Sequence, residues 1–167
     1  FAPERKRALP LFPEHVALIT SRDAAAYTDF LRVSGARWPV ATLYHYDTGV
    51  QGATATEEVI AAIAAANSAD VTYDAIVVVR GGGSLEDLHV FNTEAVARAV
   101  FASRVPVVSG VGHERDVTII DMVADVRAAT PSNAAELIFP DQRDVVQLLQ
   151  HHTEMQDNAV HRLLQRH

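Results

Sequence analysis

The sequence predicts an α/β protein with an open, mostly parallel, doubly wound (Rossmann-like) sheet of about four or more strands and helices on both faces. Three observations support this fold class. Short β-branched apolar runs alternate with longer segments of helical composition, as in parallel sheets with crossover helices. The runs are apolar throughout, as in strands buried on both faces. The 167 residues are 49% hydrophobic, which suffices for one domain with a core and an appendage.

The order of the elements follows from these runs. The expected strands are, in chain order, 15–20, 39–46, 75–79 and 105–109. The helices expected between and after them are 24–35, 56–66, 93–102 and 117–123. The order of the strands within the sheet cannot be read from these patterns.

Small polar residues mark the expected helix starts. Ser21 and Asp23 offer an N-cap for the first helix, and Asn92 or Thr93 offers one for the helix before the fourth strand. Ser132, after the Thr-Pro pair at 130–131, is expected to cap a further helical turn.

From Gln142 onward the pattern changes to that of one long amphipathic helix, with apolar residues at spacings near three and four. We expect the beginning of a coiled coil or of a partner-binding arm, truncated at its end because no cap follows. The residues of this stripe are Val145, Leu148, Leu149, His152, Met155, Val160, Leu163 and Leu164.

The stretch around the third strand is the most informative part of the chain. The buried run Ala75 to Val79 ends at Arg80, and three glycines and a serine follow before a helix can begin at Leu85. Backbone N–H groups in such a loop can approach a phosphate closely, and open α/β sheets bind ligands at the carboxyl ends of their strands. A tight turn beside a merely solvated arginine is the alternative. The four loop residues are Gly81, Gly82, Gly83 and Ser84.

A second polar loop, residues 110–116, follows the fourth strand. Its His113, Glu114 and Asp116 should share a rim with Arg80 if the two strands are neighbours. An imidazole can move a proton near neutral pH, and a carboxylate can orient it or activate water. A guanidinium can neutralise the charge that develops on phosphoryl oxygens. Together these groups would suit phosphodiester hydrolysis without a metal.

A metal-assisted reaction stays open on the residues alone, because carboxylate oxygens are the ligands that Mg²⁺ prefers. Their spacing matches no specific metal motif. Taken singly, Asp29 reads as an exposed helix charge, and Ser84 lacks the context of a nucleophile elbow. The carboxylates that could serve as ligands are Asp29, Glu114, Asp116 and Asp121.

The bulk composition excludes several classes of protein. The net charge of −7 is wrong for a self-sufficient nucleic-acid binder, so a polyanion would have to meet a local basic patch. The absence of cysteine excludes disulfides and thiolate metal sites and fits a cytoplasmic location. No signal peptide or membrane-spanning run is visible, so we expect no membrane association.

Two long motifs resemble the central domain of the large subunit of bacterial exodeoxyribonuclease VII. The first is VRGGGSLEDLHVFN, starting at Val79, and the second is VPVVSGVGHERDVTIIDMVADVRAATPSNAAEL, starting at Val105. The similarity extends upstream through LPLFPEHVALITS and the Val-Gln-Gly of 50–52, and it covers roughly residues 8–139.

The resemblance implies an enzyme that degrades single-stranded DNA from either end to short 5′-phosphorylated oligonucleotides. The family's essential positions fall here on Asp29, Arg80, His113 and Asp116. Our own hypothesis from the residues adds that Arg80 and the N–H groups of Gly81 to Ser84 bind the scissile phosphate. The resemblance implies no required cofactor, or Mg²⁺ as an activator. Asp29, Asp116 and Glu114 are the candidate metal ligands.

The resemblance also implies a domain plan and a partner. Residues 1–13 would be a linker from a missing N-terminal OB-fold, 14–140 the catalytic domain, and 141–167 the start of a helical extension that binds several copies of a small subunit. Two other functions stay open: a strictly Mg²⁺-dependent phosphoesterase, and a non-catalytic nucleotide- or phosphate-binding module that assembles a complex.

Overall fold

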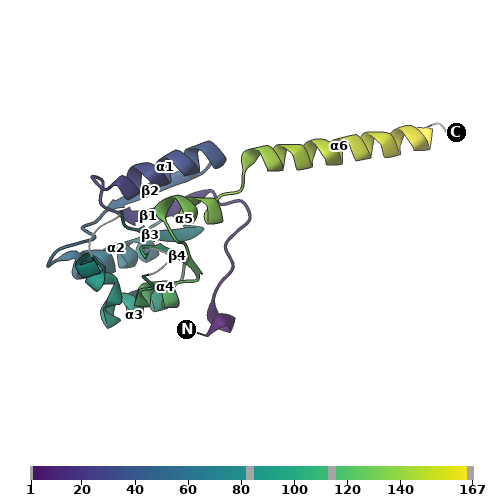
Figure 1. Ribbon diagram of the computed structural model, residues 1–167. Coiled ribbons are helices and arrows are strands. Elements are labelled where there is room, and N and C mark those ends of the chain that lie inside the picture. Colours follow the sequence, from purple (N-terminus) through teal and green to yellow (C-terminus); the bar gives the residue numbers. More distant parts are fainter. Residues whose placement is uncertain (1, 82–84, 113–115, 165–167) are drawn as a thin grey trace.

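The computed structural model describes residues 2–81, 85–112 and 116–164. Within them, an entirely parallel sheet lies between two layers of helices, and a long helix extends away from this body (Figure 1). This confirms the predicted fold class. The strands lie in the order β2-β1-β3-β4-β5. Their bounds are β1 His15–Thr20, β2 Thr42–Asp47, β3 Ala75–Val79, β4 Val107–Gly110 and β5 Val126–Arg127.

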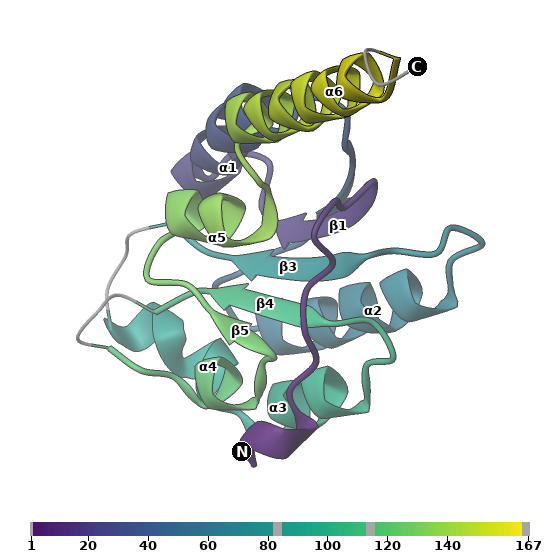
Figure 2. The same ribbon diagram turned by 90° about the vertical axis from the view of Figure 1, so that its right-hand side faces the viewer.

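The helices divide between the two faces of the sheet. Figure 2 shows α1 and α5 above the strands and α2, α3 and α4 below them. The α-helices are α1 Ala25–Arg37, α2 Ala55–Ser68, α3 Glu94–Ala102, α4 Ile119–Val123, α5 Pro131–Ile138 and α6 Gln142–Leu164. Two 3₁₀ helices, η1 Pro3–Arg5 and η2 Leu85–Asn92, complete the set.

Alternation along the strands builds one core on each face of the sheet. In β1, Leu18 points into the core shared with α1 and α5, whereas Ile19 points into the core shared with α2, α3 and α4. Phe30 of α1 and Phe139 after α5 meet edge to face at 6.1 Å in the first core. Full burial of a side chain of this size stabilises the fold by roughly 1.5–3 kcal/mol relative to exposure, so these apolar runs determine the architecture.

The strand order places a crevice between β1 and β3. The chain leaves β1 through α1 to reach β2 on one side, and it returns through α2 to reach β3 on the other side. The connections at the carboxyl ends of β1 and β3 therefore diverge. This is the topological switch point at which open α/β sheets bind their ligands.

The structure corrects two of the predicted helix caps. The N-cap of α1 is Ala24, without a side-chain cap, because the backbone N–H of Ala24 bonds to the Ser21 carbonyl in a turn that leaves Ser21 and Asp23 outside the helix. The N-cap of α5 is Thr130, whose Oγ1 accepts from the N–H of Asn133 at 3.0 Å, so Ser132 lies inside the first turn.

Other predictions hold with shifted boundaries. Thr93 caps α3 by accepting from the N–H of Val96, as predicted. The helix expected from Leu85 is a 3₁₀ helix. Strand β2 begins only at 42, because the N–H of Ala41 closes a turn on the carbonyl of Trp38. The short strand β5 was not predicted.

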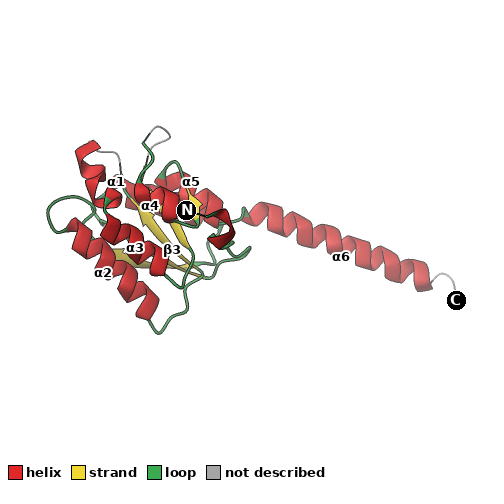
Figure 3. Ribbon diagram, turned by 90° about the horizontal axis from the view of Figure 1, so that it is seen from below, coloured by secondary structure: helices red, strands yellow, loops and turns green. Residues whose placement is uncertain are grey.

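Helix α6 projects from the body, as Figure 3 shows most clearly. Its amphipathic helical character was predicted, and it is tied to the end of α1 by a hydrogen bond from Gln142 Nε2 to the carbonyl of Ala36 at 3.3 Å. Leu148 and Leu149 are 55% and 61% exposed. None of the described helices has both the length and the hydropathy required to cross a membrane.

Candidate active site at the carboxyl edge of the sheet

Arg80 directly follows β3, whose five residues are all fully buried. Its own exposed fraction is only 6%, and its backbone N–H points to the carbonyl of Gly110 on β4 at 3.5 Å. A guanidinium keeps its charge at any physiological pH and presents five N–H donors in a rigid fork. The sheet therefore holds a permanent cation at the carboxyl ends of its central strands.

Arg80 lines a cavity of about 440 Å³ at the crevice between β1 and β3. The walls come from three connections: the β1–α1 turn, the loop after β2, and the start of the glycine loop after β3. The cavity thus lies at the switch point of the sheet. Its lining residues are Ser21, Asp23, Ala24, Ala25, Gly49, Val50, Gln51, Arg80 and Gly81.

Gly81 lies against the first turn of α1. A Cβ built on it would be 3.6 Å from the backbone nitrogen of Ala26 and 4.0 Å from that of Ala25. The first turn of α1 contains no acidic residue and no side-chain cap. Ala24 and Ala25 at the start of α1 line the same cavity as Arg80, so its wall combines the N-terminal end of a helix with a buried cationic residue.

Asp29 lies one turn further along α1. Its side chain is 50% exposed and pairs with Arg32 at 3.3 Å. Among the described residues, it is not part of the cavity wall that contains Arg80. The structure therefore places Asp29 on the helix that borders the cavity, and leaves its predicted chemical role untested.

The second predicted loop begins beside Arg80, because Val79 and Gly110 are register partners in neighbouring strands. This confirms that the third and fourth predicted strands are neighbours, which is the condition on which the shared rim was predicted; His113 and Glu114 themselves lie outside the described residues. At Gly112 the chain turns so tightly that a Cβ would collide with the carbonyl oxygen of Asp116. Asp116 is thus held at the base of this loop.

Several of the predicted site residues lie outside the described residues. They are Gly82, Gly83 and Ser84 of the glycine loop and His113 and Glu114 of the second loop. Arg80, Gly81 and Asp116 are described, and all three lie at the carboxyl edge.

Asp121 has a structural role that the sequence did not indicate. Its side chain is buried, Oδ1 accepts from Ser109 Oγ at 2.5 Å, and Oδ2 accepts from the N–H and the hydroxyl of Thr118 at 2.9 and 2.7 Å. Arg127 Nε lies 3.9 Å from the same Oδ2. These bonds tie the start of α4 to β4, so this carboxylate braces the second loop.

No cluster of three or more His, Asp or Glu side chains able to hold a metal exists within the described ranges. Asp121 Oδ1 and Oδ2 already accept hydrogen bonds, and the Asp29 carboxylate faces Arg32. Asp116 is described, but its candidate co-ligand Glu114 is not. Of the candidate ligands in the second loop, the structure therefore describes only Asp116.

The loop after β2 contributes residues to the cavity wall that were not among the site residues predicted from the sequence. Gly49 and Gln51 line the cavity, and Glu58 of α2 fixes this loop by accepting from the Gly49 N–H at 2.8 Å and from Thr54 Oγ1 at 2.7 Å. The hydrogen bond from Thr54, and then that from Gly49, lower the pKa of Glu58. The Val-Gln-Gly triplet at 50–52 was the available signal, since it formed part of the family resemblance.

The comparison with known families identifies the family of the chain. A model of the family described as exonuclease VII, large subunit, matches residues 1–167. The chain belongs to that family. The exodeoxyribonuclease 7 large subunit of Desulforudis audaxviator is 54% identical over 145 residues, which cover 87% of this chain and 36% of that protein.

Two further relatives carry the same name. The Haemophilus influenzae (strain Rd) protein is 48% identical over 166 residues, covering 99% of this chain and 38% of that protein. The Salinibacter ruber protein is 53% identical over 149 residues, covering 87% and 37% respectively. The exonuclease VII chain described here thus spans a little over a third of the length of these relatives.

Proposed function

We propose that this exonuclease VII chain is a catalytic domain that hydrolyses phosphodiester bonds of single-stranded DNA from either end, leaving short oligonucleotides with 5′-phosphates. The single observation that carries the proposal is the buried Arg80 in a cavity at the switch point, beside the loop that begins at Gly110. The membership of the exonuclease VII large-subunit family supports the choice of reaction.

Arg80 and the N–H groups of Gly81 to Ser84 bind the non-bridging oxygens of the scissile phosphate. A charged, pre-oriented donor stabilises the negative charge that builds up in the transition state more than it stabilises the ground state. Because the guanidinium is fixed by the core around β3, it needs no reorganisation when that charge develops.

The second loop supplies proton transfer. A water molecule, positioned by Asp116, gives a proton to that carboxylate and attacks phosphorus, so that a new P–O bond forms while the bond to the 3′ oxygen breaks. His113 gives a proton to the departing 3′ oxygen, which leaves a 3′-hydroxyl and a 5′-phosphate. Asp29 assists as a second carboxylate on the α1 side of the cavity.

A Mg²⁺-dependent version of the reaction is the second candidate. It would use the carboxylate ligands named from the sequence, Asp116 and Glu114 with Asp29, to hold the ion, and the position of Asp116 after the strand next to Arg80 supports it. The metal would polarise the phosphoryl oxygens and lower the pKa of a bound water.

We propose in addition that α6 binds helical small subunits. Its exposed apolar side chains, among them Leu148, Leu149 and Met155, are suited to pack against amphipathic helices of a partner.

The test uses the full-length protein with its small subunit and end-labelled single-stranded and duplex DNA, in EDTA and in Mg²⁺. Wild type is compared with His113→Ala and Arg80→Ala, and His89→Ala in η2 is the matched control because His89 is exposed. Loss of the proton donor should slow digestion of single strands by at least about 10²-fold.

The outcomes separate the candidates. Digestion that survives EDTA and disappears with His113→Ala supports metal-independent chemistry. Digestion that stops in EDTA and returns with Mg²⁺ makes the carboxylates metal ligands. Saturable binding of a mononucleotide without cleavage of any DNA would instead identify a phosphate-binding module.

A further inference from the structure

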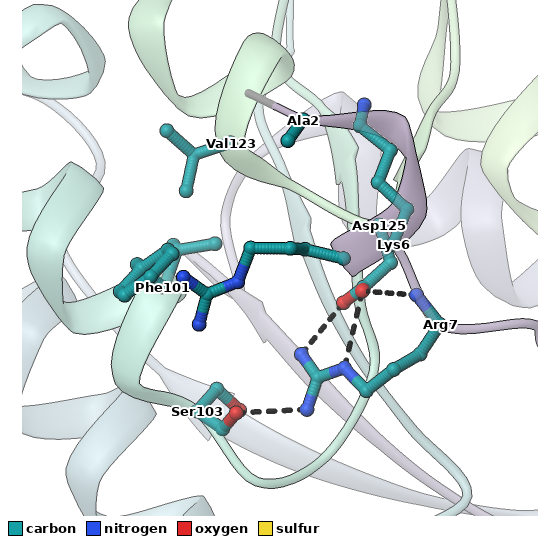
Figure 4. Close-up of a pocket in the computed structure, with 9 residues that line it drawn as sticks. Ala2, Lys6, Arg7, Phe101, Ser103, Val123 and Asp125 are labelled. Atoms are coloured by element: carbon teal, nitrogen blue, oxygen red, sulfur yellow. Dashed lines mark hydrogen bonds and ion pairs between the residues drawn. The ribbon is translucent and has the colours of Figure 1, made fainter.

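The segment before the first strand is anchored on the body by Arg7. Its backbone N–H and its Nε donate to Asp125 Oδ1 at 2.7 and 3.1 Å, and a terminal nitrogen donates to Oδ2 at 2.7 Å (Figure 4). The other terminal nitrogen donates to the carbonyl of Ser103 at 2.8 Å. Such a two-pronged pairing with a carboxylate fixes orientation as well as distance. We call these contacts between Arg7, Asp125 and Ser103 the clasp.

Asp125 is nearly buried, with only 6% of its side chain exposed. Its Oδ2 also accepts from the N–H of Val107 at 2.7 Å, and its own N–H donates to the carbonyl of that residue at 2.9 Å. Asp125 therefore fastens the exit of α4 to the start of β4. Because a buried carboxylate is costly without a partner cation, Arg7 is the group that permits this arrangement.

Helix α4 connects the clasp to the second loop. Asp125 lies two residues beyond the end of α4, and Asp121 in its first turn holds Ser109 and Thr118. The helix is only five residues long, and its Ile120 is fully buried. A short helix that is fixed at both ends and anchored in the core by a buried apolar side chain transmits a displacement of one end to the other, because the packed core around that side chain resists deformation.

Asp116 lies on the far side of this connection. Its carbonyl oxygen packs on Gly112, and Oδ2 of Asp121 lies close to the same glycine. The rigid path therefore runs from Arg7 through Asp125 and α4 to Asp121 and the base of the second loop. Arg7 itself is at the amino ends of β4 and β5, on the opposite edge of the sheet from that loop.

We infer that Arg7 is a positioning residue for catalysis: through Asp125 and α4 it sets the placement of Asp116 beside Gly112, although it touches no substrate. This inference rests on the proposed function of the second loop. It makes the segment before β1 a functional part of the catalytic domain, and it gives a role to Asp125 in the Val-Ala-Asp-Val-Arg stretch at 123–127.

The experiment measures digestion of single-stranded DNA by the full-length protein with its small subunit, together with hydrogen exchange of backbone amides in 117–121. Arg7→Ala should lower kcat by at least about tenfold while KM changes by less than about twofold, because a misplaced catalytic group slows chemistry without weakening remote substrate binding. Amides in 117–121 should exchange faster. Arg7→Lys should restore part of kcat, since it keeps the charge but loses the fork.

Arg98→Ala is the matched control, because Arg98 forms an exposed ion pair with Glu94 on α3 and does not take part in the clasp. It should leave kcat and hydrogen exchange at wild-type values. The inference would be overturned if Arg7→Ala lowered the unfolding midpoint but left kcat and the exchange in 117–121 unchanged. The clasp would then only stabilise the fold. If the wild type cleaves no DNA, the proposed function fails, whereas the exchange measurement still decides whether Arg7 orders the segment 117–121 at the start of α4.

Discussion

Replacing Gly112 by alanine tests whether the second loop has the tight geometry described above. A Cβ at this position would collide with the carbonyl oxygen of Asp116 and would lie 2.6 Å from Asp121 Oδ2. Neither group can yield easily, because one is backbone and the other is held by Ser109 and Thr118. The loop must therefore move.

The expected magnitude follows from overpacking. Inserting one methyl group into a filled site costs typically about 1–3 kcal/mol. In a domain of this size each kcal/mol lowers Tm by roughly 2–4 °C. Displacing Asp116 by even a fraction of its side-chain length should slow DNA digestion by up to about 10²-fold, since catalytic groups act only in a narrow range of geometry.

Thermal unfolding and digestion of end-labelled single strands measure the two effects in the same preparation. Gly35→Ala is the control, because nothing lies within 4 Å of its built Cβ in α1. In a helix interior this change should raise stability by about 0.5–1 kcal/mol and leave digestion unchanged. A Gly112→Ala variant with wild-type Tm and wild-type digestion would refute the described loop geometry.

Three further predictions concern carboxylates and α6. Asp121→Asn should lower the free energy of unfolding by about 1.5–3 kcal/mol in urea titrations, because an amide offers one acceptor oxygen where the carboxylate uses two, one for Ser109 and one for Thr118; an unchanged midpoint would contradict this role. Burial opposes ionisation of Asp125, but the hydrogen bonds from Arg7 outweigh it and lower its pKa from the ordinary 3.8. The charge of Asp125 therefore stabilises the fold above pH 3.8, and this stabilisation is lost as the pH falls through the lower pKa of the folded state. Asp125→Asn should have a lower free energy of unfolding than wild type at pH 7, and the difference should shrink below about pH 4. A difference that does not change with pH would argue against the clasp. Leu148→Asp should weaken small-subunit binding at least about tenfold without changing Tm, while Gln147→Asp should change neither, as checked by sedimentation of the mixed subunits.

The fold class could be predicted because apolar runs such as Ala75–Val79 are long enough to define buried strands. The order of those strands could not, since any buried parallel strand shows the same run of Val and Ile whether its neighbour is β1 or β4. The two-residue strand β5 is too short to carry a periodic signal.

Helix caps show a finer limit of sequence reasoning. Ser132 and Thr130 both precede helical residues and both carry a hydroxyl, and only the backbone conformation decides that Thr130 is the cap. Likewise Ser21 and Asp23 have side chains that can cap a helix, but the turn after β1 places Ala24 at the N-cap position.

For the site, the sequence placed Arg80 correctly at the end of a buried strand and at the same rim as the second loop. It could not find the clasp, because Arg7 and Asp125 are separated by 118 residues in the chain. It read Asp121 as a candidate ligand, since burial of a carboxylate among hydroxyl donors leaves no mark on local composition.

Helix α6 leaves the body at the edge of the sheet opposite the cavity. It starts where α1 ends, at the Gln142 contact with Ala36, and α1 begins beside the cavity. Its 23 residues extend over about 35 Å at 1.5 Å per residue (Figure 1). The exposed face of α6 and the cavity are therefore mechanically separable: a fluorophore or an immobilising tether near His151 would leave the cavity accessible, so the proposed subunit binding and the proposed reaction can be measured independently.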